Sequence, residues 1–272
     1  MEELCKLLND WDITHERHDL SPEAWRFIRD KGFLGIIIPK AYGGLEFSAF
    51  AHSEIVTKIS TRSGAAGVTV MVPNSLGPAE LLIHYGTEAQ KKKYLPKLAK
   101  AELIGCFGLT EPDFGSDPGS MVTRAEKVPN GFKLNGAKMW ISNAPIADLC
   151  VVWAKLDGKI RGFIVERDTK GFSTPKIEGK LSLRASITGE IVMDGVVVSE
   201  DHLLPNVSGL KGPFGCLNRA RYGISWGVMG AAEDCMHRAR QYTLDRIQFG
   251  KPLAQTQLVQ KKLADMMTDI TL

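Results

Sequence analysis

The sequence lacks several features that mark large classes of protein. Its five cysteines are odd in number and form no CxxC pair, so we expect mostly buried free thiols in a reducing compartment rather than a disulfide framework. No apolar run approaches the roughly 20 residues that a membrane span needs. The N-terminus begins Met-Glu-Glu, which is typical neither of a secretory signal nor of an Arg-rich transit peptide. We therefore predict a cytoplasmic protein, or a mitochondrial matrix protein if a presequence is missing.

Other absences narrow the range of functions. The net charge of +3 is too small to imply nucleic acid, and the lysines at 91–93 are typical of a solvated helix face. No GxGxxG motif follows a predicted strand, so we do not expect a nicotinamide-binding Rossmann domain. Residues 15–19 (HERHD) carry metal-ligating side chains without a second cluster, so we predict a solvated segment and no metal site. The composition is that of a globular protein, long enough for about two domains.

The first hundred residues show helical signals. Ser21 precedes a proline and is typical of an N-cap, and the glycines and proline of residues 32–45 predict a loop between helices. A capping-box pattern begins at Thr87 and predicts a Lys-rich helix that ends before Pro96. We therefore expect an N-terminal all-helical domain over residues 1–102.

The hydrophobic period changes near Leu103. Residues 133–142 and 190–199 are rich in β-branched side chains and alternate in polarity, as strands do. Residues 128–131 (VPNG) are a hairpin signal. Many short strands punctuated by glycine predict a middle β-barrel domain over residues 103–209.

The helical period returns at about residue 210. A second helix is expected from about Gln255 to the end, and this last pattern shows no C-cap signal. Residues 210–272 thus read as the start of an incomplete C-terminal helical domain, which gives an α+β multidomain fold. The first of its helices carries apolar residues at helical spacing, which predict one apolar face: Ile224, Val228, Ala231, Cys235, Ala239 and Tyr242.

Three segments carry side chains suited to a ligand. Residues 107–117 combine glycines with hydroxyls and carboxylates and can present N–H groups to a heterocycle or phosphate, although a plain turn has the same composition. Trp140 and Ser142 point to the same side of a regular strand, which suits an aromatic ligand with a polar edge as well as a core tryptophan. Arg246 can bind a pyrophosphate or the last carbonyls of its own helix.

Taken in order, these segments resemble the acyl-CoA dehydrogenase family over nearly the whole chain. The motifs are GFLGIIIPKAYGG, YGTEAQKKKYLPKLAKAELIGCFGLTEPDFGSD, NGAKMWISNA, RARYGISWGVMGAA and DRIQFGKPLAQTQ. From about residue 85 onward, KLSLRASITGEIVMDGV and PFGCLNRARYGISWG are similar to the glutaryl-CoA dehydrogenase branch. Residues 1–84, with TVMVPNSLGPAELLIHYG, resemble the bacterial long-chain branch. This pattern is the one expected of a hybrid of two branches.

The resemblance implies an enzyme that removes two hydrogens from an acyl-CoA thioester. It implies FAD as cofactor, an electron-transfer flavoprotein as electron acceptor and a homo-oligomeric full-length form. The residues that it assigns to FAD are Phe107, Leu109, Thr110, Glu111, Gly115, Ser116, Trp140, Ile141 and Ser142, with Arg246 and Gln257 reaching FAD across a subunit interface. The residues that it assigns to the acyl-CoA are Ser116, Phe214, Leu217, Asn218 and Arg221, with local helix bonding the alternative for Asn218 and Arg221.

The resemblance also implies what residues 1–272 do not supply. In these two branches the catalytic base is a glutamate whose position falls past Leu272, so no catalytic residue is assigned here. The arginine that holds a substrate carboxylate in the glutaryl branch maps near Gly67, with Arg62 five residues away, so decarboxylation is not predicted. Two alternatives stay open. One is a catalytically silent relic that binds flavin or acyl-CoA, and the other is an oxidase or monooxygenase of the same fold.

Overall fold

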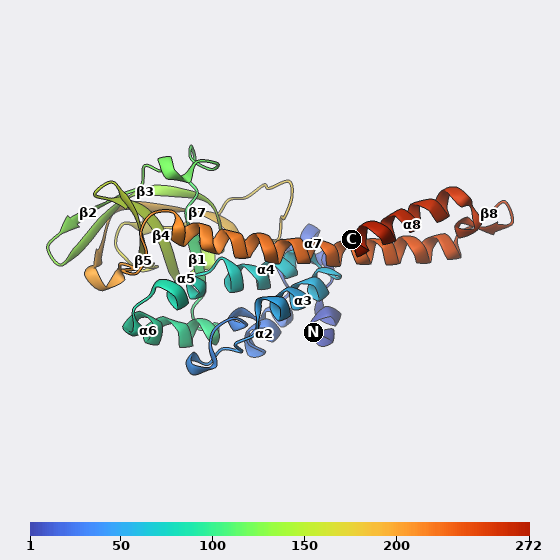
Figure 1. The fold of residues 1–272 in the computed structure, drawn as a ribbon, viewed down its shortest axis with the longest axis horizontal. Helices are drawn as coiled ribbons and strands as arrows, with labels where there is room; N and C mark the ends of the chain where they lie inside the picture. Colours follow the sequence, from blue (N-terminus) through green and yellow to red (C-terminus); the bar gives the residue numbers. More distant parts are fainter.

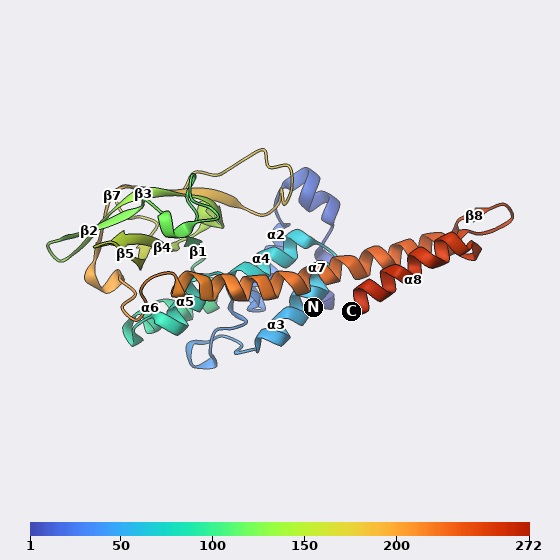
Figure 2. The same ribbon diagram turned by 45° about the horizontal axis from the view of Figure 1, so that its top comes forward.

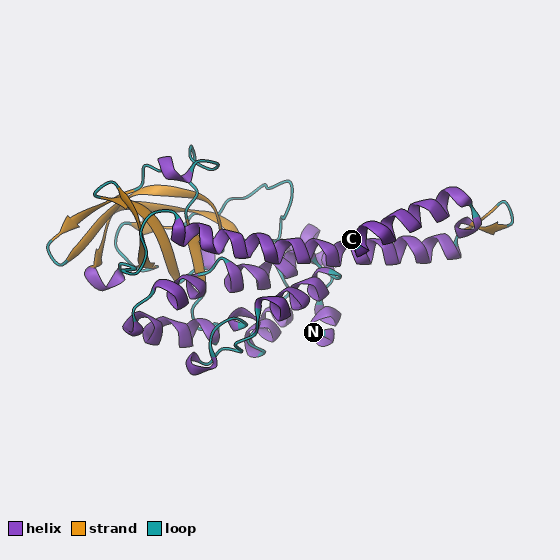
Figure 3. Cartoon of the chain, viewed as in Figure 1, coloured by secondary structure: helices purple, strands orange, loops and turns teal.

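The computed structural model describes residues 1–272 as helices, then a sheet, then two further helices (Figure 1) (Figure 3). The N-terminal helices are α1 (Glu2–Leu7), α2 (Pro22–Asp30), α3 (Ala49–Ser60), α4 (Gly64–Ser75), α5 (Pro78–Tyr85) and α6 (Glu88–Ala99). The strands are β1 (Gly105–Gly108), β2 (Arg124–Val128), β3 (Gly131–Ser142), β4 (Leu149–Leu156), β5 (Lys159–Glu166), β6 (Phe172–Ser173) and β7 (Thr188–Ser199). The last helices are α7 (Lys211–Asp245) and α8 (Gln257–Thr271), joined by a hairpin of β8 (Ile247–Gln248) and β9 (Lys251–Pro252).

Local signals set the starts of the N-terminal helices. The Ser21 hydroxyl accepts the Ala24 N–H at the start of α2, and the capping box at Thr87 is formed with both of its hydrogen bonds. The predicted end of α6 before Pro96 is wrong, because the helix runs on to Ala99. A proline in the last turns removes a single intrahelical bond, and the core face of α6 continues past it with the buried Leu98.

The seven strands form one curled sheet with the order β1-β4-β2-β3-β7-β6, and β5 pairs with β4. The predicted hairpin is confirmed, since Val128 of β2 pairs with Gly131 of β3. Successive residues of a strand face opposite sides, and β4 therefore supplies two cores. Val151 and Trp153 pack with α5 and α6, while Val152 packs inside the curl of the sheet.

The cysteines are free thiols distributed through these cores. Cys5, Cys106, Cys150 and Cys216 are buried, and Cys235 on α7 is exposed. The sulfurs of Cys106 and Cys150, which face each other across β1 and β4, lie 2.9 Å apart.

Helix α7 is 35 residues long and runs from the sheet across α4 and α3 (Figure 1). Its far half leaves the N-terminal helices and forms an arm with α8, which folds back beside it (Figure 2). Neither α7 nor any other helix has the length and hydropathy that crossing a bilayer requires.

The face of α7 that packs on α3 and α4 differs from the predicted apolar face. The buried positions are glycines, among them Gly223, Gly227 and Gly230, whereas Ile224 and Val228 are exposed. Glycine lets two backbones approach closely. A Cβ at Gly230 would lie 2.1 Å from the carbonyl oxygen of Thr57 in α3.

Candidate functional site

A cavity of about 360 Å³ lies where β1 and β3 end against the C-terminal end of α4 and the first turns of α7. It brings together every predicted site residue except Glu111, Asn218, Arg246 and Gln257. Its lining consists of Val72, Leu76, Phe107, Leu109, Thr110, Gly115, Ser116, Pro118, Trp140, Ile141, Ser142, Phe214, Leu217 and Arg221.

The polar groups of the cavity are available to a ligand. The hydroxyls of Thr110, Ser116 and Ser142 line it, and none of them bonds to another group of the protein. They come from the loop after β1 and from the end of β3, so they converge from two sides. Hydroxyls can donate and accept, which suits the edge of a polar heterocycle.

Trp140 owes its place in the cavity to a β-bulge. In a regular strand Lys138 and Trp140 would share one face, yet Lys138 is fully buried while Trp140 is 56% exposed. The pairing of β3 with β7 shifts between Lys138 and Ile141, and Trp140 has a φ of 61°. A bulge re-aims a side chain in this way. Trp140 and Ser142 thus line one cavity, as predicted, but through an irregularity that strict alternation does not include.

Glu111 does not line the cavity. Its side chain is buried against that of Lys138, with Nζ 2.8 Å from Oε1. Burial raises the pKa of Glu111, but hydrogen bonds from Lys138, Thr123 and Val122 outweigh it and leave that pKa below its usual value. Burial lowers the pKa of Lys138 to about 8 against the opposing effect of Glu111. The Glu111 side chain thus forms an internal ion pair, and the expected contact of Glu111 with a ligand stays a prediction.

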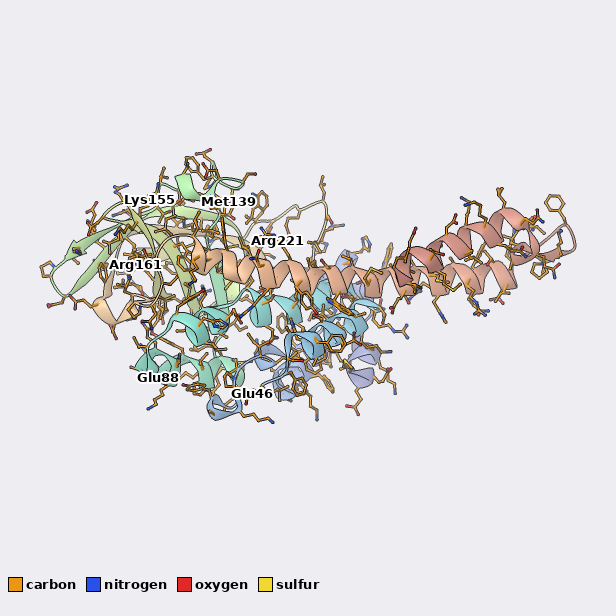
Figure 4. The ribbon with its side chains drawn as sticks, in the orientation of Figure 1. Glu46, Glu88, Met139, Lys155, Arg161 and Arg221 are labelled. Carbon is orange, nitrogen blue, oxygen red and sulfur yellow. The ribbon has the colours of Figure 1, made fainter.

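The first turns of α7 close the cavity with Phe214, Leu217 and Arg221. Arg221 donates to the Oδ1 of Asn218 at 2.7 Å, three residues before it. Asn218 lies in a neighbouring cavity with Arg219, so local bonding accounts for its side chain. Figure 4 labels Arg221 on α7 and Met139 on β3, the strand that ends at this cavity.

Arg246 and Gln257 lie at the far end of the arm, next to the β8–β9 hairpin and away from the cavity (Figure 1). Arg246 follows the last residue of α7, and its backbone N–H bonds to the carbonyl of Tyr242. Neither residue reaches the cavity within one chain. Their expected role, across a subunit interface, stays a prediction.

The cavity fits a flat aromatic group with polar edges. The indole of Trp140 offers a face for stacking, Leu109 and Ile141 supply apolar walls, and the hydroxyls meet the polar positions. No aspartate or glutamate lines it. Its shape and chemistry thus suit a flavin ring and an acyl chain, while the carboxylate that an acid–base step requires is not part of the lining.

The sequence reasoning missed four residues at this site. Val72, Leu76 and Pro118 line the cavity, and Lys138 underlies it. Val72 of α4 and Leu76, which caps this helix, belong to the segment TVMVPNSLG, and nothing in that segment indicates a ligand. Lys138 stands among residues of alternating polarity, so its charge indicated a solvent-facing position.

Three family profiles match successive parts of the chain. The profile "Acyl-CoA dehydrogenase, N-terminal domain" matches residues 1–102, the middle-domain profile matches residues 106–196, and the C-terminal-domain profile matches residues 208–272.

Individual relatives and a solved structure give the same result. A glutaryl-CoA dehydrogenase from Desulfococcus multivorans is 36% identical over 99% of this chain and 70% of its own length. A mitochondrial 2-methylacyl-CoA dehydrogenase from Solanum tuberosum is 37% identical over 90% of this chain and 60% of its own length. The structure of a glutaryl-CoA dehydrogenase from Mycobacterium smegmatis in complex with FADH2 superposes with a TM-score of 0.91, at 39% identity, over 98% of this chain and 69% of that one.

The chain therefore spans between 60% and 70% of the length of these proteins. The expected fold class is confirmed: N-terminal helices, a curled middle sheet and C-terminal helices. From its N-terminal to its C-terminal helices, the chain belongs to the acyl-CoA dehydrogenase family.

Proposed function

We propose that this chain binds FAD and forms part of an enzyme that dehydrogenates an acyl-CoA thioester between its α and β carbons. One observation carries the proposal. Three unpaired hydroxyls and an exposed indole converge on one cavity in a chain that belongs to this family. When bound there, FAD supplies the hydride acceptor, and the protein supplies binding and orientation.

The proposed roles follow the cavity walls. Leu109 and Thr110 would meet the pyrimidine edge of a bound flavin, and Trp140, Ile141 and Ser142 would cover its ring. Phe107 and Gly115 would form part of the flavin wall, and Ser116 would contact the ribityl-phosphate portion and the acyl-CoA. Phe214, Leu217 and Arg221 would line the acyl-CoA channel. Arg246 and Gln257 would bind the FAD of another subunit.

The protein's own part in the reaction is to hold the α-carbon of the thioester beside fixed donors and to keep water away. An α-proton is weakly acidic, so donors aimed at the developing enolate oxygen lower the barrier. We propose that the base which takes this proton comes from outside the cavity lining, because no carboxylate lies there. Glu111 follows the lining residue Thr110 in the sequence, but its side chain forms an ion pair with Lys138.

We propose an acyl-CoA as the class of substrate and do not assign its acyl group. The arginine position of the glutaryl branch maps near Gly67, where a Cβ would lie 2.3 Å from the Oγ of Ser60. Arg62 is exposed and does not line the cavity. Neither of these two positions therefore supplies a cation to the cavity for a second carboxylate, and decarboxylation is not part of the proposal.

The wider setting is proposed from the family. We propose an electron-transfer flavoprotein as acceptor and a homo-oligomer as the full-length form. We also propose the division into residues 1–102, 103–209 and 210–272. The cytoplasmic or matrix location stays a prediction.

Titration with FAD tests the proposal. The purified chain should quench flavin fluorescence at a stoichiometry of one, and an acyl-CoA should then change the flavin absorption spectrum. A chain that binds no FAD contradicts the proposal. Binding of FAD and acyl-CoA without any reduction, even with an external carboxylate base, favours the silent relic. Consumption of O₂ by the reduced protein in preference to a carrier flavoprotein favours the oxidase or monooxygenase.

A further inference from the structure

Lys138 is a charged residue in the interior of the middle sheet. Its side chain is 0% exposed and that of Glu111 is 1% exposed. Lys138 Nζ donates to Glu111 Oε1 at 2.8 Å and to the carbonyl oxygen of Leu109 at 3.1 Å. The Glu111 carboxylate also accepts the N–H groups of Val122 at 2.7 Å and Thr123 at 3.0 Å. The ion pair thus joins β3 to the loop that leaves β1 and to the segment that enters β2.

Apolar groups lie beside this pair. A Cβ at Gly108 would lie 3.5 Å from Lys138 Cγ, and the Met121 sulfur lies 3.9 Å from Nζ. An ion pair in such apolar surroundings loses the hydration of both charges, and apolar side chains of similar volume are often at least as stable. Packing alone therefore does not account for the pair.

The pair lies at the base of the bulge that presents Trp140. Lys138 is the last regularly paired residue before the register shift. The next residue, Met139, donates its N–H to the carbonyl oxygen of Thr110 at 2.9 Å. Two bonds from Lys138 and Met139 therefore fix the carbonyls of Leu109 and Thr110, one residue before Trp140 takes its φ of 61°. A bulky residue seldom adopts this conformation unless its surroundings enforce it.

We propose that the buried Lys138–Glu111 ion pair is a positioning element that holds Trp140 in its left-handed conformation over the cavity and fixes the Leu109–Thr110 wall opposite. Neither charged side chain touches the ligand. The inference rests on the proposed function, since the flavin ring is the ligand that Trp140 would cover.

The test is an apolar replacement of the whole pair, Lys138→Met with Glu111→Leu, which avoids leaving one charge buried alone. The double variant should keep its circular dichroism and melting cooperativity. Its FAD dissociation constant should rise roughly ten- to hundred-fold, the range expected for a lost stacking contact, and the visible circular dichroism of the bound flavin should change. Lys133→Met, an exposed lysine of the same strand, is the matched control and should bind FAD like the wild type.

A double-mutant cycle with Trp140→Ala identifies the route of the effect. If the pair acts through Trp140, its replacement should add little to the loss already caused by Trp140→Ala. Fully additive losses would overturn the inference. If the apolar double variant does not fold, Glu111→Gln decides, since it keeps the volume and weakens the pair. Unchanged FAD affinity and flavin spectrum in that variant would overturn the inference while leaving the proposed function intact. A wild-type chain without FAD affinity would instead contradict the proposed function itself.

Discussion

At the scale of single residues, replacing Trp140 is the most direct test of whether the cavity binds the flavin. Trp140→Ala removes an exposed indole from a wall shared with Ser142. The loss of a stacking contact of this kind weakens the binding free energy by about 1–3 kcal/mol, so the FAD dissociation constant should rise by the corresponding factor. Trp11→Ala removes another exposed tryptophan, one outside the cavity, and serves as control. Equal dissociation constants for wild type and Trp140→Ala would show that the indole does not contact the flavin.

A second residue, His52 of α3, couples stability to pH. Burial lowers the pKa of His52 to about 4, and its Nε2 has no hydrogen-bond partner. The unfolded chain binds a proton near pH 6.5 and the folded chain only near pH 4. The stability that neutral His52 confers is therefore complete above pH 6.5 and is lost as the pH falls toward 4.

The size of this effect follows from the same shift. About 2 kcal/mol of the free energy of unfolding should be lost between pH 7 and pH 5. Urea unfolding at several pH values measures it, and the comparison with His52→Gln isolates it from other titrating groups. Parallel pH profiles for the two proteins would assign the acid sensitivity to groups other than His52.

At the scale of elements, the contact between α3 and α7 depends on glycine. In Gly230→Ala the new Cβ would lie 2.1 Å from the Thr57 carbonyl oxygen, so the helices must separate. Such overpacking costs about 1–3 kcal/mol. Gly215→Ala, on the same helix, places its Cβ 3.5 Å from the Tyr85 hydroxyl and should be neutral or slightly stabilising. Chemical denaturation of both variants checks the contrast, and similar stabilities would show that the helices adjust without cost.

The elements also show what the sequence can predict. The cap at Ser21, the capping box at Thr87 and the hairpin at residues 128–131 depend on neighbours along the chain, and all three are confirmed. The face of α7 that packs on α3 and α4 was not predicted, because hydrophobic spacing alone cannot indicate a contact made by glycine. The end of α6 was wrong because tertiary burial of Leu98 outweighs the local signal of Pro96.

The candidate site shows the same difference between local signals and tertiary contacts. Residues of the loop after β1 and of the end of β3 were assigned to one ligand through the family resemblance of contiguous motifs, and they line one cavity. Glu111 and Lys138 bond to each other across 27 residues of sequence, a contact that no local motif indicates. A lysine in an alternating strand reads as solvent-facing until a bulge and a distant carboxylate are known. Arg246 and Gln257 do not reach the cavity of their own chain, so a pattern within one chain does not identify their partners.

At the scale of the whole molecule, the arm of α7 and α8 carries apolar side chains without a partner. Phe249 at the hairpin is 100% exposed, and Val228, Leu258 and Met267 are also exposed. Exposed apolar area of this kind favours association. We expect the purified chain to self-associate in a concentration-dependent way, and Leu258→Glu to weaken that association without lowering the melting temperature. Sedimentation velocity measures the association of both proteins and thermal unfolding measures their melting temperatures; a strictly monomeric wild type would contradict the expectation.

The last prediction concerns activity, which depends on the whole set of parts. The cavity offers donors and an aromatic wall but no carboxylate. General-base help contributes on the order of 10²–10⁴-fold, so this chain alone should turn over acyl-CoA slowly even when it is saturated with FAD. The assay uses acyl-CoAs from short to long, glutaryl-CoA included, with an artificial electron acceptor.

Added formate or acetate is the control for the prediction that turnover is slow because a base is missing. If the missing element is a base and the cavity is otherwise correctly formed, a small carboxylate that enters it should raise the slow rate in proportion to its concentration. A misformed cavity would not respond. Robust turnover without any additive would show that a glutamate within residues 1–272 acts as the base. Glu80 and Glu111 are both buried and would then be the first glutamates to replace by glutamine.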